Sequence, residues 1–257
     1  SIVIKNEIDS GRIRLNLIFR NIEFIGVLDF AGLETNLELK FENCEFIADE
    51  DKRAKHCLNL QRSDLKSLEI YNCKFDRNIN LDDITVRNFI TIKNKEINEL
   101  PLKIEIRFLR CQVYGEVSIK NLFLQSTRRC LYFTGAKQIE KINIDQCNIE
   151  NSSIDISNAN INEININRSK FNNSSLNAHH IYCKENIYIG YVEIKNGNIN
   201  FYNSIIRGTI DLKDINLLNS DVLLGNTSIE RKLAIKDCQT ISTDKENQIL
   251  INNSKIS

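Results

Sequence analysis

Eight cysteines are the most chemically versatile residues of this 257-residue chain. Cysteines can bind a metal, form disulfides or act as nucleophiles, and each role requires a particular spacing. They stand at positions 44, 57, 73, 111, 130, 147, 183 and 238, and the chain contains no C-x-x-C. A zinc ribbon or thioredoxin-like site is therefore not expected. We predict reduced, buried thiols, with Cys57 and Cys130 the most exposed because they lie at apparent insertions.

Two of the three histidines, His179 and His180, are adjacent in the segment NAHHIYC. Adjacent residues of a strand point to opposite faces, so we expect no metal between them. Arg128 and Arg129 could bind an anionic sugar or phosphate, but a solvated corner is the simpler interpretation. Motifs of nucleophilic or nucleotide-binding sites, such as G-x-S-x-G and the P-loop, do not occur. We predict no catalytic residue, no metal and no cofactor.

Composition and charge narrow the class of protein. Basic and acidic residues balance at 34 each, which gives no electrostatic footprint for nucleic acid or an anionic membrane. No apolar run approaches the roughly 18 residues of a membrane span, and the first residues do not resemble a signal peptide. We predict a cytoplasmic bacterial protein without a nucleic-acid or membrane partner, either complete or one module of a longer protein.

Apolar residues recur in pairs separated by one residue. In residues 142–171 the pairs begin at offsets 0, 5, 12 and 17, and the pattern restarts at 22. The same unit begins at residues 17, 39, 68, 106, 142, 164, 187, 210 and 233. Alternation by two favours strands over helices. A period of 22–23 residues with four short sides is typical of one solenoid turn, which is stable only when stacked on its neighbours.

In many turns a small residue precedes a large one by two positions, as in Cys44/Phe46 and Ala159/Ile161. We expect the first members of the second pairs to form one column: Ile22, Cys44, Cys73, Cys111, Cys147, Ser169, Val192, Ile215 and Cys238. This pattern resembles the pentapeptide-repeat proteins, whose units read Ala-Asp/Asn-Leu-x-x and turn in 20 residues. The resemblance implies an all-β, right-handed parallel β-helix with four sides, here of about nine turns. Members of that family share no activity, so it implies no function.

Insertions interrupt the period near 47–57, 93–103 and 125–141. We expect residues 1–257 to form a single β-solenoid domain despite them. The register between residues 90 and 105 stays open: Ile90 and Ile92 fit the start of a turn, but the turn that follows would be too short.

Two functions fit a fold of this kind. The first is a non-enzymatic scaffold for protein–protein binding or assembly, because solenoids offer long regular sides. The second is a carbohydrate-active β-helix enzyme, either a lyase or a hydrolase, acting on a polysaccharide in a side groove walled by the insertions. Hydrolysis would need two outward carboxylates about 5–10 Å apart. A cluster of acidic and basic side chains in a walled groove would favour the enzyme, and a flat side would favour the scaffold.

Most outward positions carry polar residues such as Asn, Asp, Glu, Lys or Ser, but one outward surface also carries large apolar groups. His179 and Tyr202 lie at the same offset from the starts of their turns. Tyr182 and Ile205 lie at a second common offset, which is three residues further along the chain. We predict that these four residues form a contiguous patch that binds a protein partner or a second copy of the chain. The two ends of the rod would also expose strand edges, which we expect to be covered by flanking sequence or by another subunit.

Overall fold

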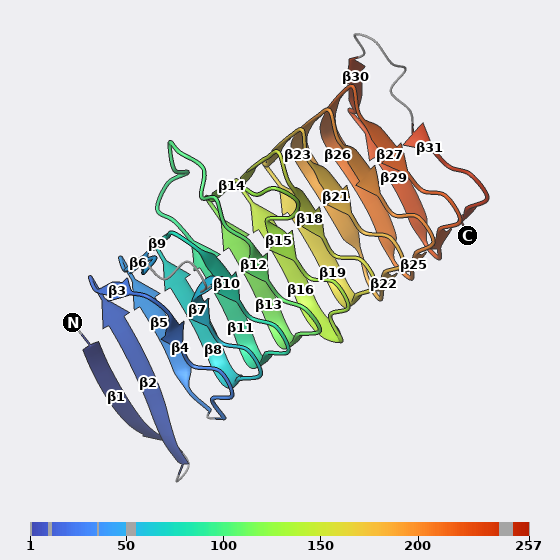
Figure 1. Ribbon diagram of the computed structural model, residues 1–257. Helices are drawn as coiled ribbons and strands as arrows, with labels where there is room; N and C mark the ends of the chain where they lie inside the picture. The colour runs from blue at the N-terminus through green and yellow to red at the C-terminus, as the bar shows by residue number, and fades with distance from the viewer. Residues whose placement is uncertain (1, 10–11, 35, 50–54, 242–248, 257) are drawn as a thin grey trace.

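The structure is a computed structural model that describes residues 2–9, 12–34, 36–49, 55–241 and 249–256. These residues form 32 strands and no helix, so the described chain has no helix that could cross a membrane. The strands stack as the coils of a right-handed parallel β-helix, which confirms the predicted fold class (Figure 1).

Each coil has four sides, numbered here in the order in which the chain passes through them. The long strands form the first side, and many continue around a corner: β2 (Arg12–Arg20), β5 (Glu38–Glu42), β8 (Asp64–Tyr71), β11 (Thr85–Lys93), β13 (Gln112–Lys120), β16 (Gln138–Asp145), β19 (Asn160–Asn167), β23 (Ile187–Lys195), β26 (Thr209–Leu218) and β29 (Lys232–Lys236). Shorter strands of the second side are β3 (Glu23–Ile25), β6 (Glu45–Ile47), β9 (Lys74–Phe75), β14 (Phe123–Gln125), β17 (Asn148–Glu150), β20 (Lys170–Asn172) and β30 (Gln239–Ile241).

The third side is a sheet of its own with ten strands. It contains β4 (Leu28–Asp29), β7 (His56–Asn59), β10 (Asn78–Asn80), β12 (Ile106–Arg107), β15 (Leu131–Tyr132), β18 (Ser153–Asp155), β21 (Ser175–Asn177), β24 (Asn198–Asn200), β27 (Asp221–Leu223) and β31 (Ile249–Leu250). The fourth side begins the long strands of the early turns and has separate strands later, namely β22 (Tyr182–Cys183), β25 (Ile205–Ile206), β28 (Ser228–Ile229) and β32 (Lys255–Ile256).

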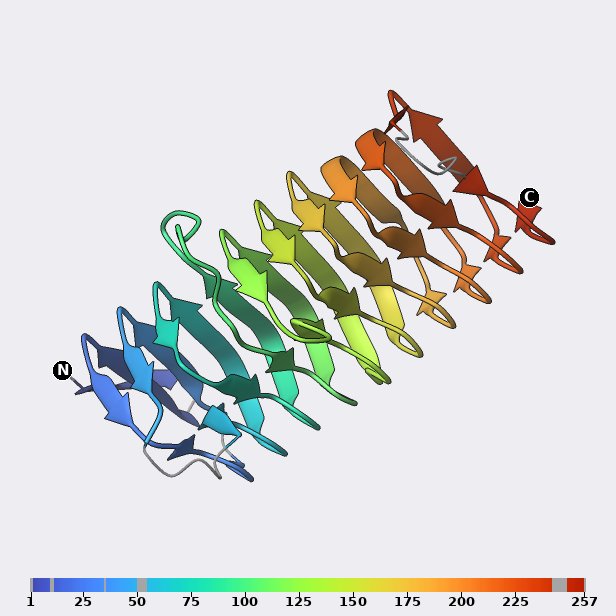
Figure 2. The same cartoon turned by 45° about the horizontal axis from the view of Figure 1, so that its top comes forward.

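Ten strands on the third side mean ten turns, one more than the sequence pattern indicates. The additional turn begins at Ile90, which pairs with Leu68 in the turn before it and with Val117 in the turn after it. Residues between β11 and β12 lengthen this turn and project from the rod (Figure 2). The expectation that Ile106 begins a turn is wrong, because Ile106 lies on the third side.

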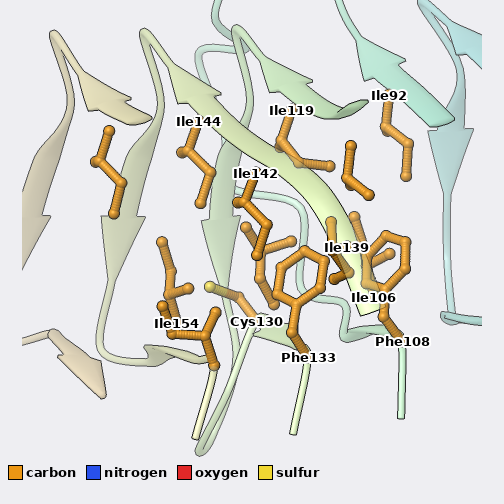
Figure 3. Packing of buried hydrophobic residues seen from close by; sticks show 14 of the residues in the cluster. Ile92, Ile106, Phe108, Ile119, Cys130, Phe133, Ile139, Ile142, Ile144 and Ile154 are labelled. Atoms are coloured by element: carbon orange, nitrogen blue, oxygen red, sulfur yellow. The ribbon is translucent and has the colours of Figure 1, made fainter. Parts of the chain in front are cut away.

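Inward apolar residues form columns along the axis. One column of the first side contains Ile142, Ile164, Ile187 and Ile210, which are backbone partners in successive turns. These four residues are fully buried, and each such isoleucine stabilises the fold by roughly 1.5–3 kcal/mol. Deeper in the same core Phe108 and Phe133 stack with ring centroids 4.4 Å apart (Figure 3). The predicted alignment of these turn starts is confirmed, whereas the expected column of second-pair residues is wrong at Cys111, which directly precedes β13 on the fourth side.

Corners depend on residues with left-handed backbone, and asparagine is the most frequent residue type among them. Asn173, Asn196 and Asn219 have φ values of 49°, 51° and 50° at the corner between the second and third sides. Asparagine adopts this conformation more readily than most residues. The side-chain amide of Asn196 donates to Asn173 at 2.9 Å, and that of Asn219 donates to Asn196 at 3.3 Å. The corner is thereby held by a ladder of amides.

The two ends of the first side differ. At the N-terminal end β1 (Ile2–Asp9) pairs with β2 in the antiparallel direction, so a hairpin closes this edge (Figure 1). At the other end β29 carries exposed Lys232 and Lys236, a charge pattern that discourages pairing with a foreign strand. Ile241 and Ile256 are 56% and 45% exposed in the last turn. That flanking sequence or a subunit covers these ends stays a prediction.

Seven of the eight cysteines are buried and reduced, and only Cys238 is partly exposed. The expectation that Cys57 and Cys130 are exposed is therefore wrong. Both residues lie where the chain enters the third side after a long connection, and their side chains turn inward. The Cys57 thiol donates to the carbonyl oxygen of Arg77 at 3.0 Å. Burial raises the pKa of Cys57 to about 11 and that of Cys130 to about 12.

Thiol labelling of the native protein tests this assignment. A water-soluble disulfide reagent at neutral pH should modify Cys238 first, because its thiol is partly exposed, and the other seven cysteines only after denaturation. Mass spectrometry of the labelled peptides identifies the modified residue. Fast native labelling of Cys57 or Cys130 would show that these entry points to the third side are open.

Candidate functional site

The predicted patch lies around the corner between the third and fourth sides. His180, Asn203 and Asn226 hold equivalent corner positions in three successive turns, with φ values of 57°, 56° and 52°. The turns on either side of His180 carry asparagine at this left-handed position, at Asn158 and Asn203, so His180 replaces an amide with an imidazole in this part of the rod. The patch residues His179 and Tyr202 directly precede two of these corner residues.

A hydrogen-bonded row joins the corner side chains across the turns. The Asn226 amide lies 3.1 Å from the Asn203 side-chain oxygen and 2.9 Å from the Tyr202 hydroxyl, and it donates to both. The Asn203 amide nitrogen lies 3.1 Å from His180 Nε2. His180 Nδ1 in turn lies 2.9 Å from His179 Nδ1. Asn203 therefore donates to Nε2 of His180, which leaves the His180 proton on Nδ1, directed at His179.

The two adjacent histidines do not point to opposite faces, as a strand would require. They lie at a corner, and the left-handed conformation of His180 brings its ring against that of His179. The rings meet edge to face, with centroids 5.2 Å apart and planes at 83°. The premise of our expectation about these residues is therefore wrong, although the residues that the structure describes contain no group of three or more metal-ligating side chains.

Large apolar area is exposed on the same corner. Tyr202 is 44% exposed and Ile205 is 48% exposed, while His179 and Tyr182 are half-buried. The Tyr202 ring lies over Gly225, where an added Cβ atom would stand only 2.7 Å from the ring. Because Gly225 in the next turn has no side chain, the Tyr202 ring can pack directly against the backbone there.

The other half of the patch is placed by strand register. Tyr182 and Ile205 are backbone partners on the fourth side, so their side chains lie next to one another in adjacent turns. The Arg207 guanidinium lies 5.4 Å from the centre of the Tyr182 ring and 3.6 Å from the Glu230 carboxylate. The cation–π contact and the ion pair limit the freedom of Tyr182. The spacing analysis thus placed these residues correctly relative to one another, whereas their binding role stays a prediction.

Sequence reasoning missed the corner row itself. His180, Asn203 and Asn226 stand at the same offset from the turn starts 164, 187 and 210, so their alignment was visible in the period. What could not be read was the direction of each side chain, because that depends on the left-handed corner. Arg207 and Glu230 were also overlooked, since single charged residues on an outward column carry no distinguishing signal.

Arg129 is bound within the molecule and is not a free anion-binding group. Its guanidinium lies 2.7 Å from the Asp155 carboxylate, which is 4% exposed, and 4.5 Å from the centre of the Tyr132 ring. Asp155 also accepts hydrogen bonds from the backbone and hydroxyl of Ser157. Arg128 is exposed at the corner. The arginine pair therefore divides into one structural residue and one solvated residue.

A hollow of about 680 Å³ lies beside the third side near two of the long connections. Its described lining residues are Asn78, Lys103, Glu105, Gln125, Ser126, Thr127 and Asn151. Glu105 is the one carboxylate among them, and the Ser126 hydroxyl donates to it at 3.4 Å. The nearby buried carboxylates, Asp82 and Asp155, lie three turns apart. At about 4.8 Å per turn this is roughly 14 Å, outside the range of a hydrolytic pair.

No protein-family model, no curated protein and no solved structure matches this chain. The likeness to pentapeptide-repeat proteins therefore rests on the pattern of residues and on the stacked coils alone.

Proposed function

We propose that the chain is a non-enzymatic scaffold that associates with a second copy of itself through the patch formed by His179, Tyr182, Tyr202 and Ile205. The observation that carries the proposal is the continuity of this surface. Two exposed apolar side chains and two half-buried rings occupy one corner of adjacent turns. Tyrosine is enriched in protein interfaces because it joins a large apolar ring to a polar tip.

Charge next to the patch favours a second copy as the partner. Lys184, Arg207 and Glu230 follow equivalent positions of the fourth side in successive turns and are exposed. The charge along this row changes from positive to negative in the direction of the axis. A copy related by two-fold symmetry and running the other way would place Arg207 opposite Glu230 of the partner. The patch spans two turns, roughly 10 Å along the axis, so we expect weak association that depends on concentration.

The carbohydrate-active alternative has less support. The hollow beside the third side has walls formed by long connections, as that hypothesis requires, but its described lining contains a single carboxylate. The buried carboxylates on the same side are held by arginine, with Arg107 2.7 Å from Asp82. Groups of this kind stabilise the coil, and their positions do not suit a pair that exchanges protons with a glycosidic bond.

The double substitution Tyr182→Ser with Tyr202→Ser tests the proposal. Sedimentation velocity over a range of concentrations should show that the dissociation constant of the dimer rises at least about tenfold, the effect of losing two interface tyrosines at roughly 1 kcal/mol each. The melting temperature should change little, because Tyr202 is largely exposed and Tyr182 lies outside the core.

A matched control is available in Tyr114→Ser with Tyr191→Ser. These tyrosines are 49% and 51% exposed but lie away from the patch, so their loss should leave the association unchanged. A wild-type protein that stays monomeric at high concentration would contradict the proposal, as would equal effects of the two double substitutions. If the chain associates only when a different protein is present, the patch binds a heterologous partner and not a second copy.

A further inference from the structure

The contact between His179 and His180 is unusual in its chemistry. Their Nδ1 atoms face one another at 2.9 Å on an accessible corner. Each nitrogen in its neutral, unprotonated form is a ligand for a transition metal. In the absence of a metal, one proton between them makes a hydrogen bond, and removal of that proton leaves two lone pairs directed into the same small space.

The distance between the two nitrogens decides which metals fit. Metal–imidazole bonds are about 2.0–2.1 Å long. An ion bonded to both nitrogens at their present separation of 2.9 Å therefore has an N–metal–N angle of about 90°. This angle is that of square-planar or tetragonal coordination, which Cu²⁺ and Ni²⁺ prefer. A tetrahedral Zn²⁺ site would require the nitrogens to move apart to roughly 3.3 Å.

We propose that His179 and His180 together bind one Cu²⁺ or Ni²⁺ ion through their Nδ1 atoms, with water in the remaining coordination positions. The proposal does not depend on the self-association of the patch. The site is a chelate built from consecutive residues of one chain, and the rigid corner holds both rings close before the metal arrives. Binding requires the single proton of neutral His180 to leave Nδ1 and to be held on Nε2 instead, so no proton is released on balance, and His179, which accepts at Nδ1, already carries its proton on Nε2.

The corner row allows this change of protonation without loss of hydrogen bonds. When His180 holds its proton on Nε2, that nitrogen becomes a donor towards Asn203. An amide carries a donor and an acceptor side by side, so rotation of the Asn203 and Asn226 amides by half a turn reverses the row. His180 then donates to Asn203, Asn203 donates to Asn226, and the Tyr202 hydroxyl donates to Asn226. Once its amide has rotated, Asn203 accepts from His180 Nε2 and acts as a positioning residue for the metal-binding tautomer, as second-shell acceptors do in metal sites.

Other ligands for these metals are scarce among the described residues. Seven of the cysteines are buried. Burial raises the pKa of Cys147, for example, to about 12, so this thiol is not a thiolate at neutral pH. The third histidine, His56, lies five turns away on β7 with its Nδ1 atom buried. Tight binding should therefore be limited to one ion per chain.

Calorimetric titration of the tag-free protein with Ni²⁺ at neutral pH tests the site. The fold supplies substitutions that fit their positions: His180→Asn restores the residue found at the corners of the following turns, and His179→Ser restores the residue of the preceding turn, Ser157. We expect one equivalent for the wild type and at least about tenfold weaker binding for each variant, since even the loss of an outer-shell partner costs 10–100-fold. His56→Ala is the control and should bind like wild type.

Asn203→Asp tests whether Asn203 positions His180 for metal binding or only lies beside it. A carboxylate accepts from His180 Nε2 without any amide rotation, and aspartate tolerates the left-handed corner, as Asp214 and Asp237 do with φ values of 51° and 53°. This variant should bind Ni²⁺ more tightly than wild type, by several-fold. With Cu²⁺, electron paramagnetic resonance should give a tetragonal signal split by two nitrogens. Wild-type affinity in His179→Ser or His180→Asn, or loss of binding in His56→Ala, would overturn the proposal.

Discussion

Ile189→Asp should destabilise the protein by at least about 4 kcal/mol, enough to unfold many domains of ordinary stability. Ile189 is 1% exposed and pairs with Ile166 and Leu212 in the turns on either side. An aspartate there places a carboxylate in an apolar column with no partner for its charge. Because each turn is stabilised by its neighbours, the disturbance should spread to the adjacent coils.

Ile205→Asp is the matched control for this prediction. The substitution is chemically identical and lies in the same turn, but Ile205 is an outward residue that is 48% exposed. Its effect should stay within about 0.5 kcal/mol, the range of ordinary surface changes. Urea unfolding at low protein concentration, where the proposed association through the patch would not contribute, provides the comparison. Two variants that unfold at the same urea concentration would show that inward and outward columns have been assigned wrongly.

A second large effect should appear at alkaline pH. Burial raises the pKa of Cys73, Cys147 and Cys183 to about 12, and that of Cys57 to about 11. An unfolded thiol has a pKa near 8.5. Because the folded values are the higher ones, the thiols contribute full stability below about pH 8.5, and this stability is lost as the pH rises towards the folded values. Each buried thiol should lower the free energy of unfolding by about 1.4 kcal/mol per pH unit in this range.

Cys147→Ser isolates one thiol from the set. The equivalent residue of the next turn is Ser169, whose hydroxyl donates to the Asn167 carbonyl oxygen at 2.8 Å and accepts from the Cys147 amide at 3.1 Å. A serine at position 147 should therefore cost less than about 1 kcal/mol at neutral pH. The free energy of unfolding, measured by chemical unfolding between pH 8.5 and 10, should then fall less steeply with pH than in the wild type. The difference in slope should correspond to about one proton per molecule. An unchanged slope would mean that Cys147 is not buried as described.

The repeat could be predicted from sequence because every turn reports it independently. Ile142, Ile164 and Ile187 give the period without any knowledge of the corners, and strand alternation then fixes which residues point inward. The period fails where a connection is long. Ile90 does begin a turn, but the projecting segment after β11 hides the next start at Val117. A pattern based on spacing has no means to distinguish an inserted loop from a shifted register.

Individual side-chain directions at corners were beyond the reach of the pattern. Cys57 and Cys130 were judged by their position next to insertions, yet the chain turns both thiols inward as it enters the third side. His179 and His180 were judged by the rule for strands, and the left-handed backbone of His180 sets that rule aside. The relative placement of Tyr182 and Ile205 succeeded because both lie within paired strands, where register is strict.

Hydroxyl-radical footprinting at low and high protein concentration tests most directly the central claim, that the chain associates through its tyrosine corner. The oxidation of the two patch tyrosines and of the two control tyrosines is measured in the same sample. The account predicts that oxidation of Tyr182 and Tyr202 falls as the concentration rises, while oxidation of Tyr114 and Tyr191 does not change. Oxidation of all four that is independent of concentration, or protection confined to Tyr114 and Tyr191, would contradict it.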